Sequence, residues 1–166
     1  LSHEIDYLIW MFGLPQWVTA FVSKVSNLDV DTEDEALMII GYKNNDNKKN
    51  FKVNLNLDFF RHDTKRQCTL IGEKGSIRWD GILGIVERFD TSEKRWIREF
   101  CDHDSGNKSY FFEWQHFIDC AKGKDNSLIT FQDGMNVLSL IDAARQSSSE
   151  KKRININYEN VENYYE

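Results

Sequence analysis

The chain has 166 residues, a length that suits one domain with a buried core. Hydrophobic residues make up 40% of it and charged residues 29%, which is typical of a globular protein and excludes an intrinsically disordered one. No apolar run reaches the ~20 residues of a membrane-spanning helix, and a net charge of -6 disfavours a phosphate-binding surface. We therefore expect neither a membrane nor a nucleic acid as a partner.

The chain opens with a predicted amphipathic helix that runs to Phe12. Its apolar stripe has the i, i+3, i+4, i+7 spacing and consists of Ile5, Leu8, Ile9 and Phe12. An adjoining face collects His3, Asp6, Tyr7 and Trp10. Gly13 and Pro15 supply the residue types that end a helix.

A run of strands follows, separated mainly by polar turns. The predicted strands cover residues 17–25, 35–42, 51–59, 68–72, 75–79, 84–89 and 95–100. The alternation is clearest over 51–59, where Phe51, Val53, Leu55, Leu57 and Phe59 share one face. Strand 17–25 is apolar on both faces, which predicts cover on both sides. The Lys- and Asn-rich stretch 43–50 predicts a turn.

Helices return after Ser109. The first predicted helix ends at Gly123 and carries a stripe of Tyr110, Trp114, Phe117, Ile118 and Ala121. Thr130 is expected to cap the second, with Asp133 completing a capping box. Its predicted buried face consists of Val137, Leu138, Ile141 and Ala144. Residues 153–157 predict a last short strand, and the acidic tail from Tyr158 is expected to fray.

The order of these elements predicts an α+β fold. Strands that are separated in sequence from helices favour an open, mainly antiparallel mixed sheet with the helices packed on one face. The other face of such a sheet would remain available to a second subunit. We therefore expect a homo-oligomer that forms through the sheet face.

The opening helix carries the chemistry that is easiest to interpret. A neutral imidazole at His3 can exchange a proton near pH 7, and Asp6, one turn later, could hold its tautomer. Tyr7 and Trp10 would form an aromatic wall suited to a sugar or another flat apolar surface. On spacing alone, however, a His-x-x-Asp pair on a helix is more often an ordinary surface pair.

The other histidines and the cysteines predict no site. His62, His103 and His116 fit solvated or structural positions. The run Asp102-His103-Asp104 could bind a metal in principle, but it is typical of a solvated turn. Cys68, Cys101 and Cys120 lack the spacing of zinc ligands, so no metal site is expected. We expect them to be reduced and partly buried in a cytoplasmic protein.

Nucleotide-binding motifs are missing from the sequence. Its hairpins are punctuated by glycines, but none of these glycines opens a helix as a dinucleotide-binding loop requires. The chain has no GxSxG elbow and no phosphate-binding loop. We therefore assign no cofactor-binding residues to it and expect no cofactor on this chain alone.

Several blocks of the sequence resemble one known family. Residues 2–13, Ser-His-Glu-Ile-Asp-Tyr-Leu-Ile-Trp-Met-Phe-Gly, resemble a helix of glucose-fructose oxidoreductase, inositol dehydrogenase and MocA-type enzymes. Residues 68–80 resemble the strand-turn-strand unit of that family, and residues 129–147 resemble its last helix. The blocks occur in the family's order and cover nearly the whole chain.

The resemblance implies that residues 1–166 are the C-terminal substrate-binding and oligomerisation domain of an oxidoreductase. A Rossmann domain, which this chain lacks, would bind NAD or NADP and supply a catalytic Lys from a Glu-Lys-Pro-type motif. His3 matches the family's catalytic histidine, and Asp6 matches an acidic position of the same motif. The substrate is expected to be a sugar, nucleotide sugar or cyclitol, bound with the help of Asp6, Tyr7 and Trp10.

Other interpretations stay open. Because the dinucleotide loop and the catalytic Lys are absent from these residues, we expect a fragment with no dehydrogenase activity or NAD(H) affinity of its own. One alternative is a non-catalytic dimerisation or ligand-binding module of the same fold. Another is a small acid–base enzyme that uses His3 and Asp6 without a cofactor, although no nucleophile or oxyanion site accompanies them.

Overall fold

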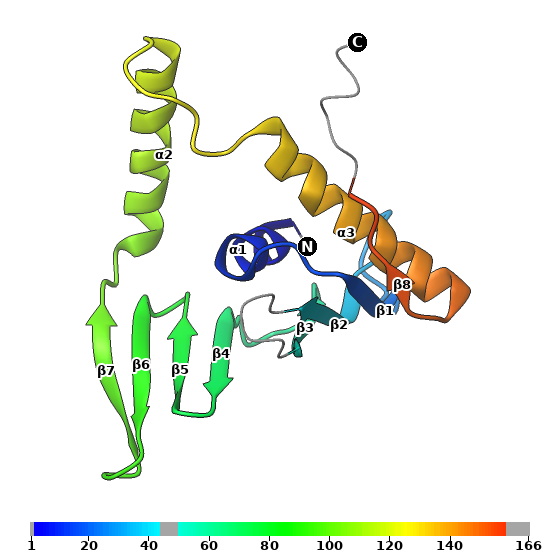
Figure 1. Cartoon of the computed structure of the whole chain (residues 1–166), viewed down its shortest axis with the longest axis horizontal. Coiled ribbons are helices and arrows are strands. Elements are labelled where there is room, and N and C mark those ends of the chain that lie inside the picture. The colour runs from blue at the N-terminus through cyan, green and yellow to red at the C-terminus, as the bar shows by residue number, and fades with distance from the viewer. Residues whose placement is uncertain (1, 44–49, 159–166) are drawn as a thin grey trace. The chain divides into compact units, whose positions relative to one another are not determined.

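The computed structural model describes residues 2–43 and 50–158, with the side chain of Ser105 left out (Figure 1). The chain folds into two compact units, one made of residues 1–61 and 128–166, the other of residues 62–127. Most of the predicted 43–50 turn and the tail beyond Tyr158 lie outside the described residues. No helix of the described part is long and apolar enough to cross a membrane.

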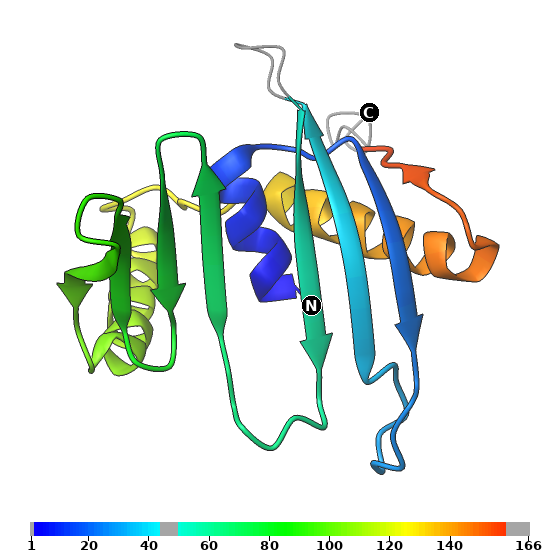
Figure 2. The ribbon, with the colours of Figure 1, turned by 90° about the horizontal axis from the view of Figure 1, so that it is seen from below.

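The first unit is a four-stranded sheet with two helices. Its elements are α1 (Ser2–Phe12), β1 (Trp17–Ser23), β2 (Glu35–Lys43), β3 (Asn50–Asp58), α3 (Phe131–Glu150) and β8 (Ile154–Asn155). The strand order is β3-β2-β1-β8, and each pairing is antiparallel (Figure 2). In the register, Ile40 of β2 lies opposite Val18 of β1 and Val53 of β3.

Both helices of this unit lie on the same face of the sheet (Figures 1 and 2). Alternate strand residues point toward them, so Val18 and Ile40 are completely buried, as is Leu140 of α3. Ile5 and Leu8 of α1 enter the same core, as the predicted stripe requires. Each such side chain contributes about 1.5–3 kcal/mol of hydrophobic free energy when it leaves water. This core fixes α1 against the sheet.

The predicted buried face of α3 is correct at Val137 and Ala144 and wrong at Leu138. Leu138 is 52% exposed, whereas Leu140 is 0% exposed. The helix contacts the sheet along Val137, Leu140, Ala144 and Ser147, an i, i+3, i+7, i+10 stripe that turns Leu138 away. The predicted capping box is confirmed, because Thr130 and Asp133 exchange side-chain-to-backbone hydrogen bonds.

The C-terminal end of α3 provides hydrogen-bond partners for one edge of the sheet. β8 pairs only with Trp17 and Val18 of β1, and no other strand of the described residues lies along the rest of that edge. Ser147 Oγ accepts the Ala20 N–H at 3.0 Å, and Ser148 Oγ accepts the Val22 N–H at 2.9 Å. Two serine hydroxyls therefore accept the backbone N–H groups of β1 beyond the end of β8.

The second unit is an antiparallel meander followed by a helix. Its elements are β4 (Gln67–Gly72), β5 (Gly75–Asp80), β6 (Ile85–Asp90), β7 (Arg95–Cys101) and α2 (Ser105–Ala121). The strands pair in the order β4-β5-β6-β7. An ion pair of 2.6 Å joins Arg78 of β5 to Glu87 of β6, and Arg78 also covers the ring of Trp96. The predicted α+β class is confirmed, with the strands divided between two hydrogen-bonded sheets.

The aromatic stripe predicted for the 109–123 helix is present in α2 but is not buried. Tyr110, Trp114 and Phe117 are each more than 60% exposed. Helical periodicity specifies which side chains share a face, but it does not specify what covers that face. Tyr110, Trp114 and Phe117 are therefore not core residues.

Candidate functional site

The four residues singled out in the sequence lie on α1. His3 and Asp6 are exposed, Trp10 is 81% exposed, and Tyr7 is half-buried against the core. Their i, i+3, i+4, i+7 spacing places them within about 100° of the helix circumference. The structure therefore brings them to one face, and that face points away from the buried Ile5 and Leu8.

The end of α1 is fixed by local chemistry. Gly13 adopts a positive φ of 76°, and its N–H donates to the carbonyl oxygen of Ile9 at 2.8 Å. Pro15, which is buried, follows, and its carbonyl oxygen accepts the hydroxyl of Tyr158 at 2.8 Å. Burial raises the pKa of Tyr158 well above its usual range, so this hydroxyl remains a donor. The candidate face is thus carried by a helix that is anchored along its length and at its end.

The α1 face consists of side chains on one side of a single helix. A groove of about 650 Å³ lies elsewhere in the first unit, between α3 and the β8 segment. It is lined by residues that include Leu138, Ser139, Asp142 and Arg153, and none of the four α1 candidates is among its lining residues. Small-molecule sites are concave, so the α1 face requires a second surface to enclose a substrate.

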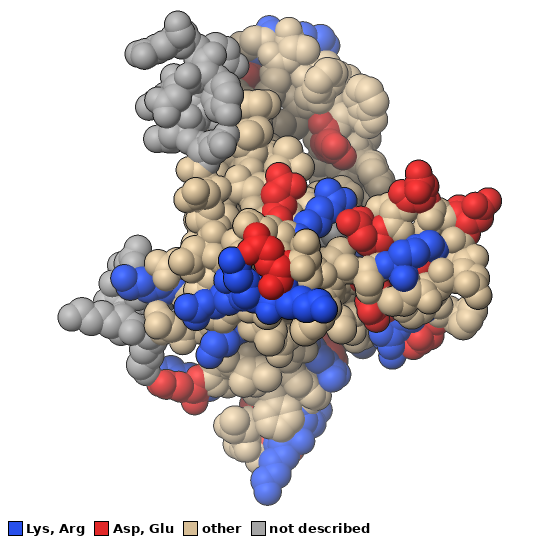
Figure 3. Space-filling model, turned by 90° about the vertical axis from the view of Figure 1, so that its right-hand side faces the viewer, with Lys and Arg blue, Asp and Glu red and all other residues tan. Residues whose placement is uncertain are grey.

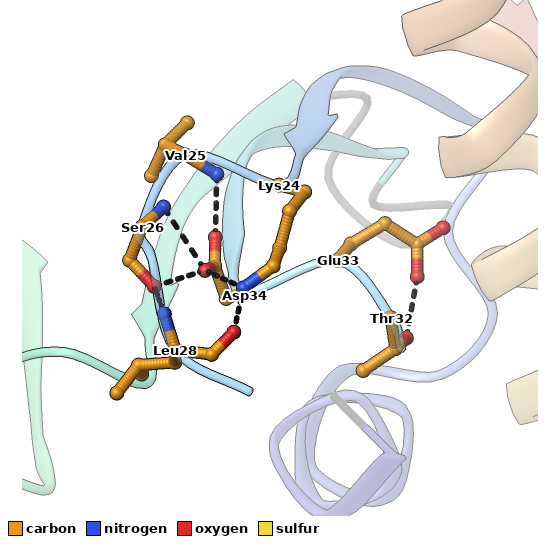
Figure 4. Close-up of polar contacts among 7 residues, drawn as sticks. All are labelled: Lys24, Val25, Ser26, Leu28, Thr32, Glu33 and Asp34. Carbon is orange, nitrogen blue, oxygen red and sulfur yellow. Dashed lines mark hydrogen bonds and ion pairs between the residues drawn. The ribbon is translucent and has the colours of Figure 1, made fainter. Parts of the chain in front are cut away.

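The buried carboxylate of Asp34 forms a second polar centre, which the sequence reading missed (Figure 4). It accepts the Val25 N–H at 2.7 Å, the Ser26 N–H and hydroxyl, and Lys24 Nζ at 3.1 Å. Burial raises the pKa of Asp34, but these hydrogen bonds outweigh burial and hold it well below its usual range. With its oxygens occupied in this way, Asp34 organises the β1–β2 connector and has no free oxygen for catalysis.

The second face of the sheet in the first unit exposes apolar side chains. Phe21 is 65% exposed, and its cross-strand partner Leu37 and the nearby Ile39 are also exposed. Trp17 lies over Gly41 on this face, and Arg153 stands 5.1 Å from the centre of the Trp17 ring. Contiguous apolar surface of this kind commonly marks an interface.

Charged groups elsewhere are mixed in sign. On the face drawn in Figure 3, lysine and arginine side chains lie beside aspartate and glutamate. Arg145 of α3 makes a two-pronged ion pair with Glu33, with N···O distances of 3.1 and 3.2 Å. The Arg145 hydrogen bond contributes, after a backbone hydrogen bond, to the lowered pKa of Glu33.

The remaining candidates do not assemble into a metal site. Among the described residues, no group of three or more His, Cys, Asp and Glu side chains is placed to hold a metal. Asp102 of the Asp-His-Asp run binds Lys108 Nζ at 2.8 Å, which lowers the Asp102 pKa. None of Cys68, Cys101 and Cys120 is in a disulfide; Cys68 and Cys120 are half-buried as expected, whereas Cys101 is exposed.

Comparisons with known proteins address the whole chain. Residues 1–156 match the family model described as the oxidoreductase family, C-terminal alpha/beta domain. WlbA dehydrogenase from Bordetella pertussis, solved with NADH and UDP-GlcNAcA, has a TM-score of 0.68 at 19% identity over 95% of this chain and 46% of that one. Levoglucosan dehydrogenase, solved with NADH, has a TM-score of 0.75 at 14% identity over 95% of this chain and 49% of that one. The chain spans about half the length of these structures, and no curated protein sequence matches it significantly.

Proposed function

Because this chain belongs to the oxidoreductase family of glucose-fructose oxidoreductase, inositol dehydrogenase and MocA, we propose that it is the substrate-side domain of an NAD(P)-dependent enzyme. Residues 1–166 serve as its C-terminal substrate-binding and oligomerisation domain, and a Rossmann domain outside this chain binds NAD or NADP. The substrate is a CH–OH or carbonyl group of a sugar, nucleotide sugar or cyclitol. The match over residues 1–156 carries this proposal, and the NADH and UDP-GlcNAcA bound to similar structures support it.

His3 is assigned the proton transfer. NAD(P) held by the Rossmann domain would supply hydride transfer to or from the substrate carbon. The imidazole of His3 takes the hydroxyl proton as the alcohol is oxidised, or returns it as the carbonyl is reduced. The supporting geometry is an exposed imidazole on a helix anchored by the buried Ile5 and Leu8, which limits its movement.

Asp6, Tyr7 and Trp10 are assigned to substrate binding. The exposed carboxylate of Asp6 can accept hydrogen bonds from sugar hydroxyls. The Trp10 indole offers an apolar face against which the C–H groups of a sugar ring can pack, and Tyr7 provides a second aromatic edge next to the core. The Rossmann domain supplies the second wall of the substrate site.

The test of His3 uses the full-length enzyme. His3→Ala is expected to lower kcat by about 10²–10⁴-fold, because it removes the proton carrier, while the affinity for NAD(H) stays within about twofold. Met11→Ala, which changes another exposed α1 residue outside the candidate face, is the matched control and should keep the wild-type kcat. Equal losses of turnover and NAD(H) affinity in His3→Ala, or no loss at all, would remove His3 from the chemistry.

The cofactor assignment has its own measurement. Calorimetric titration of NADH into residues 1–166 is expected to give no heat of binding, because no phosphate-binding loop occurs in this sequence. Tight binding to this chain alone would contradict the assignment of the cofactor to another domain.

Assembly through the open sheet face is part of the same proposal. The exposed Phe21, Leu37 and Ile39 lie on adjacent strands and form a surface that a second copy can cover. Light scattering on the chain at tens of micromolar is expected to give at least a dimer, and Leu37→Lys is expected to weaken it. Lys52→Ala, a change on the polar β3 side of the same face, is the control. A wild-type monomer at that concentration would contradict this assembly.

The exposed sheet face also supports the alternative function, a non-catalytic dimerisation or ligand-binding module of the same fold. That alternative predicts an intact dimer and no effect of His3→Ala on any turnover. We place the protein in the cytoplasm, because its cysteines form no disulfide, as is usual in a reducing compartment.

A further inference from the structure

A thiol and an imidazole meet at the end of β7, in the second unit and apart from the α1 face in sequence. Cys101 is the last residue of β7 and is exposed. Its Sγ lies 3.2 Å from Nε2 of His103. This distance allows the thiol proton to pass directly to the ring nitrogen, as it does between paired cysteine and histidine side chains.

The second ring nitrogen fixes the tautomer. Nδ1 of His103 lies 3.0 Å from the carbonyl oxygen of Leu83. A carbonyl oxygen only accepts hydrogen bonds, so Nδ1 carries the hydrogen and donates it. In the neutral ring, Nε2 is then left with a free lone pair that faces Sγ of Cys101.

The surrounding loops hold this geometry. Asp80 Oδ1 accepts the N–H groups of Ile82 and Leu83, both at 2.9 Å, and so fixes the turn that presents the Leu83 carbonyl. The Asp102 N–H donates to Gly84 O at 2.8 Å, which ties the histidine-bearing loop to the same turn. The imidazole is therefore oriented before any reagent arrives.

We propose that Cys101 and His103 form a reactive thiol–imidazole pair, a site of covalent modification by α,β-unsaturated carbonyl compounds. Sγ forms a bond to the β carbon, and the electron pair of the C=C bond moves to the α carbon and carbonyl. The thiol proton passes to Nε2 of His103 and then to the α carbon. The reaction is an addition, so it has no leaving group and needs no oxidant.

The chain contains a second thiol–imidazole contact that serves as an internal comparison. Sγ of Cys120 is 3.5 Å from Nε2 and 4.0 Å from Nδ1 of His116, so it lies at similar distances from both ring nitrogens and is not directed at one of them. Cys120 is half-buried, and Nδ1 of His116 is 3.6 Å from an Asp125 carboxylate oxygen. The longer thiol–nitrogen distance and the partial burial of Cys120 favour Cys101 as the faster nucleophile.

The test measures the rate of acrylamide addition at each cysteine of the whole chain at pH 7, by mass spectrometry of peptides. Cys101 is expected to react about tenfold faster than Cys68 and Cys120. His103→Asn keeps an amide N–H for Leu83 but offers no base to Sγ, so it should slow Cys101 about tenfold. The same change at His116 is the matched control and should leave the Cys101 rate unaltered.

Two results would overturn the proposal. An unchanged Cys101 rate in a His103→Asn or His103→Gln chain with wild-type circular dichroism would mean that exposure alone explains the labelling. A wild-type chain unfolded in urea provides a comparison without any substitution, since the cysteines should then react within about twofold of one another. A Cys101 advantage that survives in urea would show that the folded pair is not its cause.

Discussion

Ser147→Ala tests how the backbone N–H groups along the edge of β1 are hydrogen-bonded. Ser147 is 1% exposed, and its hydroxyl makes two hydrogen bonds. It accepts the buried Ala20 N–H at 3.0 Å and donates to Lys152 O at 2.6 Å, so it joins α3 to both β1 and the chain that leads into β8. Alanine keeps the shape of the site almost unchanged but removes both bonds.

The magnitude follows from burial. Each intramolecular hydrogen bond contributes about 1 kcal/mol net, and a buried N–H left without a partner costs about 1–3 kcal/mol. The higher helix propensity of alanine offsets about 0.5 kcal/mol of this loss in stability. We therefore expect Ser147→Ala to lower the free energy of unfolding by about 2–3 kcal/mol. In a cooperative unit of about 100 residues this lowers Tm by about 10–20 °C.

Urea unfolding followed by circular dichroism measures this loss, with Ser149→Ala as the matched control. Ser149 is an exposed residue of the same helix, so the control carries a similar propensity gain without the buried bonds. Ser148→Ala should fall between the two, because Ser148 bonds to both backbone groups of Val22 but is only half-buried. If Ser147→Ala and Ser149→Ala unfold within about 0.5 kcal/mol of each other, the reasoning is refuted.

The other stability predictions use the same unfolding measurement. The pKa of Asp34 is lower in the folded than in the unfolded chain, so ionised Asp34 stabilises the fold above about pH 4, and this stabilisation is lost as the pH falls further. Asp34→Asn should therefore reduce the fall in the free energy of unfolding below about pH 4. An unchanged fall in this pH range would contradict the prediction. Lys151 follows α3 in a left-handed conformation with φ 54°, which glycine adopts without steric cost. Lys151→Gly should therefore raise the free energy of unfolding by about 0.5–1 kcal/mol, and a decrease would contradict this reasoning. A Cβ on Gly41 would overlap the Trp17 indole, so Gly41→Ala should cost about 1–3 kcal/mol, and a neutral effect would show that the ring moves freely.

Local patterns were sufficient to predict most of the elements. The alternation over 51–59 found β3 within a residue at each end, and the predicted strands 68–72 and 75–79 correspond to the paired β4 and β5. Ile5 and Leu8 are buried as the stripe of α1 predicted. These features depend on neighbours in sequence, since side-chain periodicity and turn residues are properties of short segments.

Features that depend on distant segments were missed. The Asp34 carboxylate could be recognised only once the chain had turned back to place Lys24, Val25 and Ser26 around it. Leu138 and Leu140 are chemically alike, and only the angle at which α3 meets β1 decides which is buried. The division of the strands into two sheets likewise follows from pairings that no single strand specifies.

The candidate site is a mixed case. Helical spacing was enough to bring His3, Asp6 and Trp10 to one face of α1, and their exposure agrees with a surface that meets a substrate. Their chemical roles stay a prediction, which the His3→Ala measurement tests. Sequence spacing placed Cys101 and His103 two residues apart, but only the Leu83 carbonyl, brought in by the β5–β6 turn, fixes the ring nitrogen that faces the thiol.

The serine hydroxyls at the end of α3 also occupy backbone groups of β1 that another strand could otherwise bind. An unpaired strand margin is a template onto which a foreign chain can add, and repeated addition of that kind leads to fibrils. Along β1, the amide hydrogens of Ala20 and Val22 are already bound by a helix, which cannot be extended by another strand. Ser147→Ala should therefore do more than weaken the fold, because it reopens this margin to self-templating growth.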